Sequence, residues 1–191
     1  MKKLRYGIVG TGGMGSGHAH TMQSIDDVQL VAICDIVPEV AEAVGEEYNV
    51  PYMTDYRDLI ARDDVDAVVI ATPHYFHPEI AIHAMENGKP ALSEKPISVT
   101  VAQADAMVEA ARRTGVPFCV MHQTRAEPVW QAAHEIVQSG RLGEIYRTMM
   151  VYADFRSQAY YNSAGWRATW AGEGGGVLIN QAPHSLDRFT W

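Results

Sequence analysis

The sequence predicts an α/β protein in which a doubly wound parallel sheet is followed by the start of an α+β domain with an open, mostly antiparallel sheet. Short apolar runs alternate with helical patterns over residues 1–122, and the alternation stops after residue 122. A glycine-rich stretch lies directly between the first apolar run and the first helical pattern. Repeated strand–helix–strand units with short loops favour parallel strands with right-handed crossovers and helices on both faces.

Five short runs, most of them apolar and containing Val or Ile, are predicted as strands, at 4–10, 28–35, 65–72, 90–94 and 116–122. Helices are predicted between them, at 14–25, 38–48, 54–62, 77–88 and 100–115. The run "VDAVVIAT" (65–72) is apolar on both faces, which is typical of a buried parallel strand. Helix boundaries carry their own signals: Pro38 in a first turn, a capping box of Thr100 and Gln103, and Gly115 at a helix end.

Residues 123–191 follow a different pattern. A helix is predicted at 127–140, a long strand at 143–155, an aromatic and glycine-rich loop at 156–176, and a polar helix in the closing stretch "GGGVLINQAPHSLDRFTW". One strand and a loop cannot bury an apolar face alone. We therefore expect a dinucleotide-binding domain at 1–122 and, at 123–191, the N-terminal part of a substrate and oligomerisation domain, truncated at Trp191.

Composition excludes several classes of function. The net charge of −8 disfavours a nucleic-acid or anionic-membrane partner, and no apolar run approaches the roughly 20 residues that span a bilayer. The sequence shows no secretory signal. The two cysteines, Cys34 and Cys119, lie in strand-like apolar runs, so we predict reduced core thiols in a cytoplasmic protein.

The stretch "GIVGTGGMGSG" contains a complete glycine fingerprint for a dinucleotide, placed after a strand and at the start of a helix. Gly10 permits the tight turn, Gly12 lets the backbone approach a pyrophosphate, and Gly15 lets the helix pack closely on the strand. Asp35 ends the second strand, where a carboxylate accepts hydrogen bonds from ribose hydroxyls and repels a 2′-phosphate. The sequence therefore predicts a Rossmann fold with NAD favoured over NADP. The other predicted cofactor contacts in this loop are Thr11, Gly13 and Met14.

Two further loops follow strands at the edge where open α/β sheets bind ligands. In "ATPHYFHPE", we predict that Thr72, Pro73, His74 and His77 line the cofactor crevice. A metal site built from these histidines, or from His18 and His20, is disfavoured because no convergent set of cysteine or carboxylate ligands accompanies them.

In "SEKPIS", Lys95 follows a strand and precedes Pro96. A buried lysine beside a cationic nicotinamide polarises or deprotonates a hydroxyl, because both surroundings lower its pKa. From the residues alone, that role and an ordinary solvated lysine remain equally open.

Together, GTGGMG, the TPxxxH-type loop, EKP and a glycine run followed by a polar residue and a histidine resemble the Gfo/Idh/MocA family. The resemblance extends over all 191 residues in order. That family includes glucose–fructose oxidoreductase, inositol dehydrogenases and related sugar dehydrogenases. Its members are typically longer and add an open sheet that carries the substrate site and builds oligomers.

The resemblance implies roles for individual residues. Lys95 matches the active-site lysine, and His184 matches the catalytic histidine that accepts the proton of a secondary alcohol. The residue four positions before this histidine is often Asp in the family but is Asn180 here, which keeps the hydrogen-bonding shape and loses the charge. If the stretch is helical, Asn180 and His184 share a face, although Pro183 is a candidate start or kink.

The resemblance also places Glu94 and Lys95 beside the nicotinamide ribose and suggests a cis bond before Pro96. Trp166 and Arg167 are candidate contacts to cofactor or substrate. For the loop aromatics Tyr160, Tyr161, Trp166 and Trp170, such contacts and simple packing against the expected sheet remain equally open.

The function so implied is hydride transfer between NAD and the hydroxyl-bearing carbon of a sugar, cyclitol or sugar derivative, in a homo-oligomer. Two alternatives remain. One is an NAD-dependent glycosidase of the same family, and the other is a regulatory protein that binds NAD(H) without turnover, which the loss of charge at Asn180 mildly favours.

Overall fold

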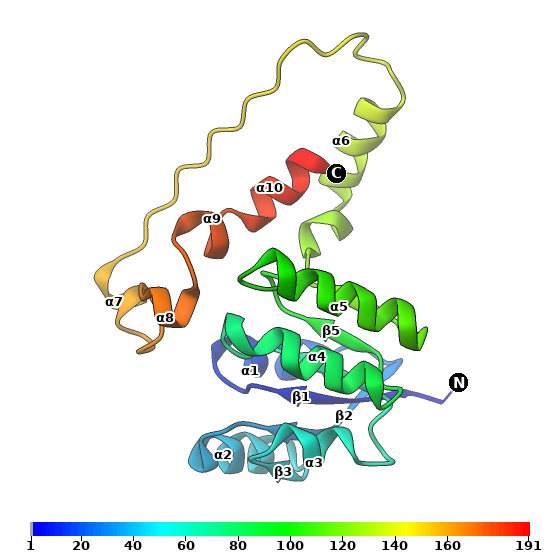
Figure 1. The fold of residues 1–191 in the computed structure, drawn as a ribbon, viewed down its shortest axis with the longest axis vertical. Helices are drawn as coiled ribbons and strands as arrows, with labels where there is room; N and C mark the ends of the chain where they lie inside the picture. Colours follow the sequence, from blue (N-terminus) through cyan, green and yellow to red (C-terminus); the bar gives the residue numbers. More distant parts are fainter. Residues whose placement is uncertain (1) are drawn as a thin grey trace. The chain divides into compact units, whose positions relative to one another are not determined.

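A computed structural model describes residues 2–191, which divide into two compact units, Met1–Val120 and Met121–Trp191 (Figure 1). The first unit contains a six-stranded sheet with the order β3-β2-β1-β4-β5-β6, and every neighbouring pair of strands is parallel. This is the strand order of the Rossmann fold, so the predicted fold class of this region is confirmed. The strands are β1 (Leu4–Val9), β2 (Val28–Cys34), β3 (Tyr52–Met53), β4 (Ala67–Ile70), β5 (Ala91–Ser93) and β6 (Phe118–Val120).

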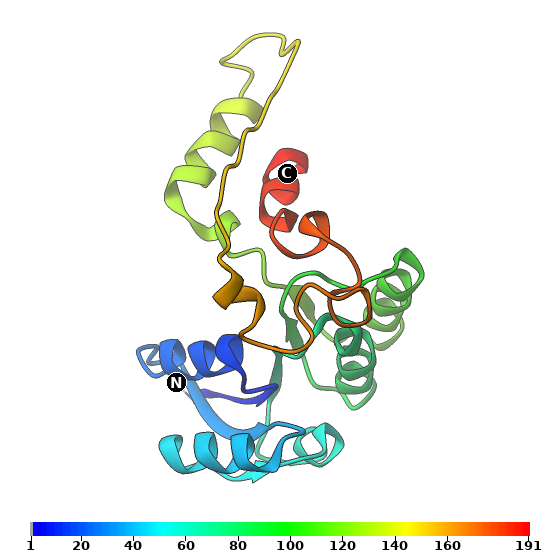
Figure 2. The same cartoon turned by 90° about the vertical axis from the view of Figure 1, so that its left-hand side faces the viewer.

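Helices cover both faces of this sheet. Figure 2 shows α1 and α2 on one side of the strands, and α3, α4 and α5 on the other. Right-handed crossovers require this division, because β1 to β3 progress across the sheet in one direction and β4 to β6 in the opposite one. The helical segments are α1 (Gly13–Met22), α2 (Pro38–Tyr48), α3 (Tyr56–Ile60), the 3-10 turn η1 (His74–Phe76), α4 (His77–Glu86) and α5 (Val101–Thr114).

Each sheet face has its own hydrophobic cluster. Val68 and Ile70 point to the side of α4 and α5, where they pack with Met85 and Met107. Ile8 and Ile33 pack on the opposite side, in the cluster that contains residues of α1 and α2. Because successive side chains of a strand point to opposite faces, a strand buried on both faces is apolar throughout, as predicted for 65–72.

The local signals at helix ends are confirmed. Pro38 is the first residue of α2, and the Thr100 hydroxyl accepts the amide hydrogen of Gln103 at 3.3 Å at the start of α5. Gly115 ends α5 with φ of 68°, a left-handed conformation that favours glycine. The sequence analysis missed β3, because two residues are too few to show a periodic pattern.

Only one of the two cysteines is buried as predicted. Cys34 is a core residue of β2, and burial raises the pKa of its thiol to about 12. Cys119 is exposed, so its assignment to the core is wrong. It lies on β6, the edge strand of the sheet. An apolar run does not distinguish an edge strand from a central one.

The second unit is helical. It contains the 3-10 turn η2 (Gln123–Ala126), α6 (Pro128–Gln138), α7 (Gln158–Tyr161), α8 (Trp170–Glu173), α9 (Val177–Asn180) and α10 (Pro183–Thr190). The helix predicted at 127–140 is confirmed as α6. The short helices α7 and α8 form where an irregular loop was predicted.

The long strand predicted at 143–155 is wrong. Residues 145–157 form neither helix nor strand, and apolar side chains such as Val151 and Phe155 are exposed. A strand requires a neighbour that pairs with its backbone, and the described residues of this unit provide none. An antiparallel sheet is therefore not formed within the described residues. None of the helices in residues 2–191 is long and apolar enough to span a membrane.

Candidate dinucleotide and active site

The glycine loop between β1 and α1 has the geometry that a dinucleotide requires. Gly10 has φ of 86°, and a Cβ on it would lie 2.8 Å from the backbone of Ala71 and Thr72. A Cβ on Gly15 would lie 1.8 Å from the carbonyl oxygen of Gly10. A Cβ on Gly12 would meet nothing within 4 Å. Gly10 and Gly15 are therefore required by the fold itself, whereas Gly12 faces open space where a ligand has room.

Asp35 follows β2 and contacts this loop directly. One carboxylate oxygen accepts hydrogen bonds from the Thr11 amide at 2.8 Å and the Thr11 hydroxyl at 3.2 Å. The other accepts from the Val37 amide at 3.0 Å. Asp35 is half-buried beside the loop. Contact of Asp35 with the ribose hydroxyls of a dinucleotide stays a prediction.

Two observations fit a bound dinucleotide at this edge of the sheet. No side chain caps the N-terminus of α1, and its first turn carries no acidic residue, so its amide groups and dipole favour an anion. The Thr72 hydroxyl, at the end of β4, is buried and makes no hydrogen bond to any described residue. A buried polar atom of this kind usually has a partner, and a ligand in the crevice is one candidate.

His77 connects the loop after β4 to the loop after β5. Its side chain is fully buried, with Nδ1 2.8 Å from the Pro96 carbonyl oxygen and Nε2 2.8 Å from the Thr72 carbonyl oxygen. Both ring nitrogens are therefore directed at backbone rather than into a crevice. His74 is also buried, and its ring lies edge-on to His77 with centroids 6.0 Å apart. Burial lowers the pKa of His77 because it disfavours the charged imidazolium.

We expect replacement of His77 by phenylalanine to destabilise the first unit by about 1–3 kcal/mol, the cost of leaving one backbone carbonyl without its imidazole N–H donor. Burial lowers the pKa of His77 in the folded protein below its unfolded value of about 6.5, so the unfolded chain binds the proton more readily and the native state loses stability as the pH falls below that value. The variant should lack this part of the pH dependence. Urea unfolding at pH 7.5 and 5.5 measures both effects, and His83→Phe on the same helix is the control. If the free energy of unfolding changes equally between the two pH values in the wild type and in His77→Phe, the prediction is wrong.

The EKP loop after β5 is the second ordered feature of the site. The bond between Lys95 and Pro96 is cis, as the family resemblance suggested. Glu94 is buried, and its Oε1 lies 2.8 Å from His18 Nε2 on α1. Burial raises the pKa of Glu94, but the hydrogen bond and charge of His18, with the amide and charge of Lys95, outweigh it, so the pKa is lowered. Lys95 itself is half-buried.

In the second unit, Asn180 and His184 lie on separate helices. Asn180 ends α9, and Pro183 is the first residue of α10, so Pro183 starts a new helix and the two residues do not share one continuous helical face. Asn180 is buried and donates from Nδ2 to Glu173 Oε1 at 2.5 Å. Glu173 is itself buried at the end of α8. The Glu173 carboxylate of α8 thus lies beside the Asn180 amide. Asn180 occupies the position at which the family named above often has Asp.

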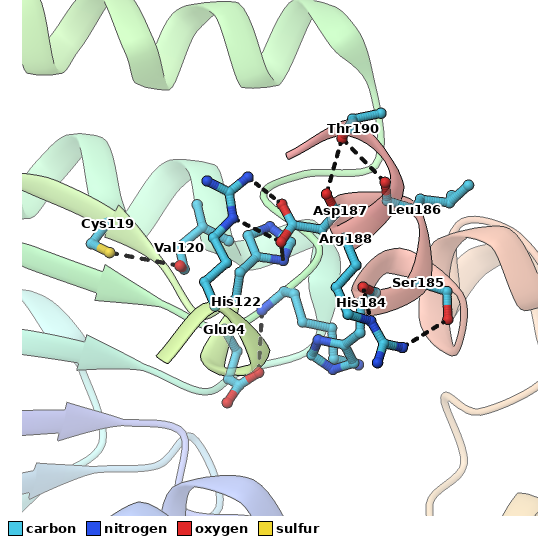
Figure 3. A network of polar contacts seen from close by, with 12 residues as sticks. Glu94, Cys119, Val120, His122, His184, Ser185, Leu186, Asp187, Arg188 and Thr190 are labelled. Carbon is cyan, nitrogen blue, oxygen red and sulfur yellow. Dashed lines mark hydrogen bonds and ion pairs between the residues drawn. The ribbon is translucent and has the colours of Figure 1, made fainter. Parts of the chain in front are cut away.

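A polar cluster surrounds His184 within the second unit (Figure 3). Asp187 on α10 forms a two-point ion pair with Arg125, at 2.9 and 2.7 Å, and lies 3.7 Å from His122 Nδ1. The His122 and His184 rings meet edge-on with centroids 6.4 Å apart. The hydrogen bonds from Arg125, with the charges of His122 and His184, lower the pKa of Asp187. The cluster thus places an ion-paired carboxylate close to the candidate catalytic histidine.

The loop candidates Trp166 and Arg167 pack on each other. The Arg167 guanidinium lies 4.7 Å from the Trp166 ring centroid and 4.4 Å from that of Tyr160, and it donates to the Tyr160 hydroxyl at 2.8 Å. Trp170, by contrast, is mostly exposed. Trp166 and Tyr160 therefore pack on Arg167, while contact of these residues with a ligand, like packing against the expected sheet, stays a prediction.

Sequence reasoning missed several polar partners in the site. His18 and His77 were weighed as metal ligands or crevice residues, yet each contacts a loop of the protein. Among residues 2–191, no three histidine, cysteine or acidic side chains converge in a group that could hold a metal ion. The partners that had no assigned role are Glu173, His122, Arg125 and Asp187. Their contacts join residues that are separated in the sequence, so no local sequence pattern predicts them.

Strand order, glycine loop and Asp35 define a dinucleotide-binding protein, and comparison with known proteins identifies its family. Residues 4–122 match the oxidoreductase family model GFO/IDH/MocA, NAD-binding Rossmann fold, and residues 130–191 match the C-terminal domain of the same family. The chain belongs to the GFO/IDH/MocA family of oxidoreductases, and its residues 4–122 are the family's NAD-binding Rossmann domain.

Individual relatives agree with this. The chain is 31% identical to a 4-carboxy-2-hydroxymuconate-6-semialdehyde dehydrogenase of a Sphingobium species, over 98% of this chain and 58% of the relative. It is 32% identical to an inositol 2-dehydrogenase of Rubrobacter xylanophilus, over 100% of this chain and 52% of the relative. The crystal structure of the WlbA dehydrogenase of Bordetella pertussis with NADH and UDP-GlcNAcA has a TM-score of 0.88 and 33% identity, over 100% of this chain and 58% of that one. The chain thus spans 58% or less of the length of these relatives.

Proposed function

We propose that this protein is an NAD-dependent oxidoreductase that transfers a hydride between the cofactor and a hydroxyl-bearing carbon of a sugar, cyclitol or sugar derivative. The observation that carries the proposal is the complete fingerprint at the edge of the sheet: Gly10 and Gly15 packed against backbone, Gly12 facing open space, and Asp35 beside the loop. The inositol dehydrogenase and the WlbA complex support the substrate class, since the first is named for a cyclitol and the second holds a nucleotide sugar.

The proposal assigns a role to each part of the chain. Residues 1–122 bind the cofactor, with the pyrophosphate at Gly10–Gly15 and the α1 N-terminus and the adenosine ribose at Asp35. The loops 72–77 and 94–95 border the nicotinamide. Residues 123–191 begin the substrate domain, where Asn180, Trp166 and Arg167 are the candidate substrate contacts. Homo-oligomerisation belongs to the same proposal on the family resemblance alone, and a reducing, cytoplasmic location is supported by the two free cysteines.

Chemically, bound NAD supplies the hydride acceptor, and the side chains manage the proton. Lys95 polarises the reacting oxygen through its ammonium group. His184 accepts the hydroxyl proton, a task suited to a group that titrates near neutrality. The paired residues Asn180 and Glu173 orient a substrate hydroxyl, and the buried carboxylate offsets the charge that Asn180 lacks.

Purified protein tests the function directly. We expect NADH fluorescence to change on binding, and the NADH absorbance band to grow when NAD is mixed with one of a panel of inositols, sugars and UDP-sugars. Failure to bind any nicotinamide cofactor would contradict the proposal. Release of free sugar without net NADH formation would indicate the glycosidase alternative, and binding without turnover of any tested compound would indicate the regulatory one.

Asp35 provides a test of cofactor choice. We expect Asp35→Ser to weaken NADH binding by roughly 10- to 100-fold, because hydrogen bonds to a charged acceptor contribute about 1.5–3 kcal/mol. Binding of NADPH should strengthen, since the repulsion of its 2′-phosphate is removed. Fluorescence titration with both cofactors measures the change, and Asp26→Ser, an exposed aspartate beyond α1, controls for net charge. An unchanged preference would remove Asp35 from the cofactor site.

A further inference from the structure

His18 and Glu94 form a largely buried contact between two elements of the candidate cofactor site. The side chains are only 15% and 8% exposed, and His18 Nε2 lies 2.8 Å from Glu94 Oε1. His18 lies on α1, three residues after the last glycine of the fingerprint, and Glu94 directly follows β5. The contact therefore spans from the helix of β1 to the end of β5, across the intervening strand β4.

Glu94 transmits this contact to Lys95. Its second carboxylate oxygen accepts the backbone amide hydrogen of Lys95 at 3.2 Å. Its own amide donates to the Ile70 carbonyl oxygen at 2.8 Å, which ties the start of the loop to the end of β4. A buried carboxylate is costly unless it is hydrogen-bonded, so the position of Glu94 depends on His18, and the backbone of Lys95 depends on Glu94.

The loop is held from its other side as well. His77 contacts the Pro96 carbonyl oxygen, one residue beyond Lys95. Two histidines from different helices thus bracket the lysine, although only His18 does so through a carboxylate. His20 is exposed on the same helix, which makes it a natural control.

We propose that His18 is a positioning residue: through Glu94 it fixes the Lys95 backbone relative to α1, and so relative to a dinucleotide whose pyrophosphate lies at the start of that helix. The inference rests on the proposed function of Lys95. It extends that function by making placement of the lysine depend on a residue outside the EKP and glycine motifs. Misplacement of a catalytic group by about 1 Å lowers the rate by up to about 100-fold.

Two substitutions separate positioning from simple packing. His18→Leu fills the space and removes the donor, whereas His18→Gln keeps an Nε2 donor able to reach Glu94. In protein that turns over substrate, we expect His18→Leu to lower kcat by roughly 10- to 100-fold with little change in NADH affinity. His18→Gln should recover most of this loss, and His20→Leu should behave as wild type. A glutamine variant as slow as the leucine variant would overturn the proposal, as would an unchanged kcat in His18→Leu.

A measurement without turnover keeps this test separate from the proposed function. Hydrogen exchange of the Lys95 amide, followed by NMR, reports its bond to Glu94 directly. We expect faster exchange in His18→Leu and wild-type exchange in His18→Gln and His20→Leu. Exchange that is the same in all four proteins would overturn the coupling of His18 to Lys95, whether or not the protein oxidises any tested compound. If exchange responds as expected but wild-type protein turns over nothing, the proposed function fails and the geometric inference stands.

Discussion

Replacement of Lys95 by alanine should lower kcat/KM by about 10²- to 10⁴-fold, the usual contribution of a group that handles a proton in the transition state. Affinity for NADH should change by less than about threefold, which corresponds to under about 0.7 kcal/mol. The physical reason is that Lys95 contacts Glu94 through its backbone amide, and alanine retains that amide. Initial rates and NADH fluorescence titration measure the two quantities on the same preparation.

The matched control for this variant is Lys3→Ala, since Lys3 is exposed at the start of β1, away from the loops that carry the site. It removes the same charge and should leave both quantities unchanged. If Lys95→Ala retains turnover, the residue has been misassigned and the lysine is an ordinary loop residue. If NADH affinity falls as far as the rate, Lys95 serves cofactor binding rather than chemistry.

Gly15→Ala should nearly abolish cofactor binding. A Cβ at this position would lie 1.8 Å from the Gly10 carbonyl oxygen, which is backbone and has no rotamer through which to move aside. The start of α1 must then shift away from β1, at a strain of about 1–3 kcal/mol. Since the shift moves the amide groups that face the pyrophosphate, we expect NADH to bind roughly 100-fold more weakly, with reduced stability to urea.

Gly17→Ala is the control, because Gly17 lies on the same helix and a Cβ there would meet nothing within 4 Å. Alanine also has the higher helix propensity, so this variant should be as stable as wild type or slightly more so. Wild-type NADH affinity in Gly15→Ala would show that the loop does not bind the dinucleotide in the manner proposed. If both variants lose affinity for NADH, the loss does not come from the close contact at Gly15. It then reflects a general intolerance of α1 to substitution.

Sequence patterns predicted the first unit almost completely because its architecture is encoded locally. Alternating apolar runs specify strands and helices, and right-handed crossovers leave few ways to assemble them. The glycine fingerprint is equally local: three glycines and one aspartate meet requirements of turn, approach and packing within a single β–α–β unit. Pro38, Thr100 and Gly115 mark helix boundaries for the same reason.

The second unit shows where local patterns fail. The long apolar run at 143–155 predicts a strand, but a strand exists only where a neighbour pairs with its backbone, and the described residues of the second unit contain none. Similarly, the four-residue spacing of Asn180 and His184 is compatible with one helix. In the structure, α9 ends at Asn180 and a separate helix, α10, begins at Pro183. Whether a strand lies at the edge or the centre of a sheet depends on the elements that pack beside it, and composition does not show this.

The sequence by itself determined the family, the dinucleotide fold, the glycine loop with its aspartate and the candidate lysine and histidine, because each depends on residues close together in the chain. The tertiary structure alone decided which side chains support them. His18 reaches Glu94 across β4, His77 joins the carbonyls of two loops, and Glu173 meets Asn180 from another helix. Such contacts depend on how strands and helices are ordered in space, and buried polar groups make them specific because each must find a partner there.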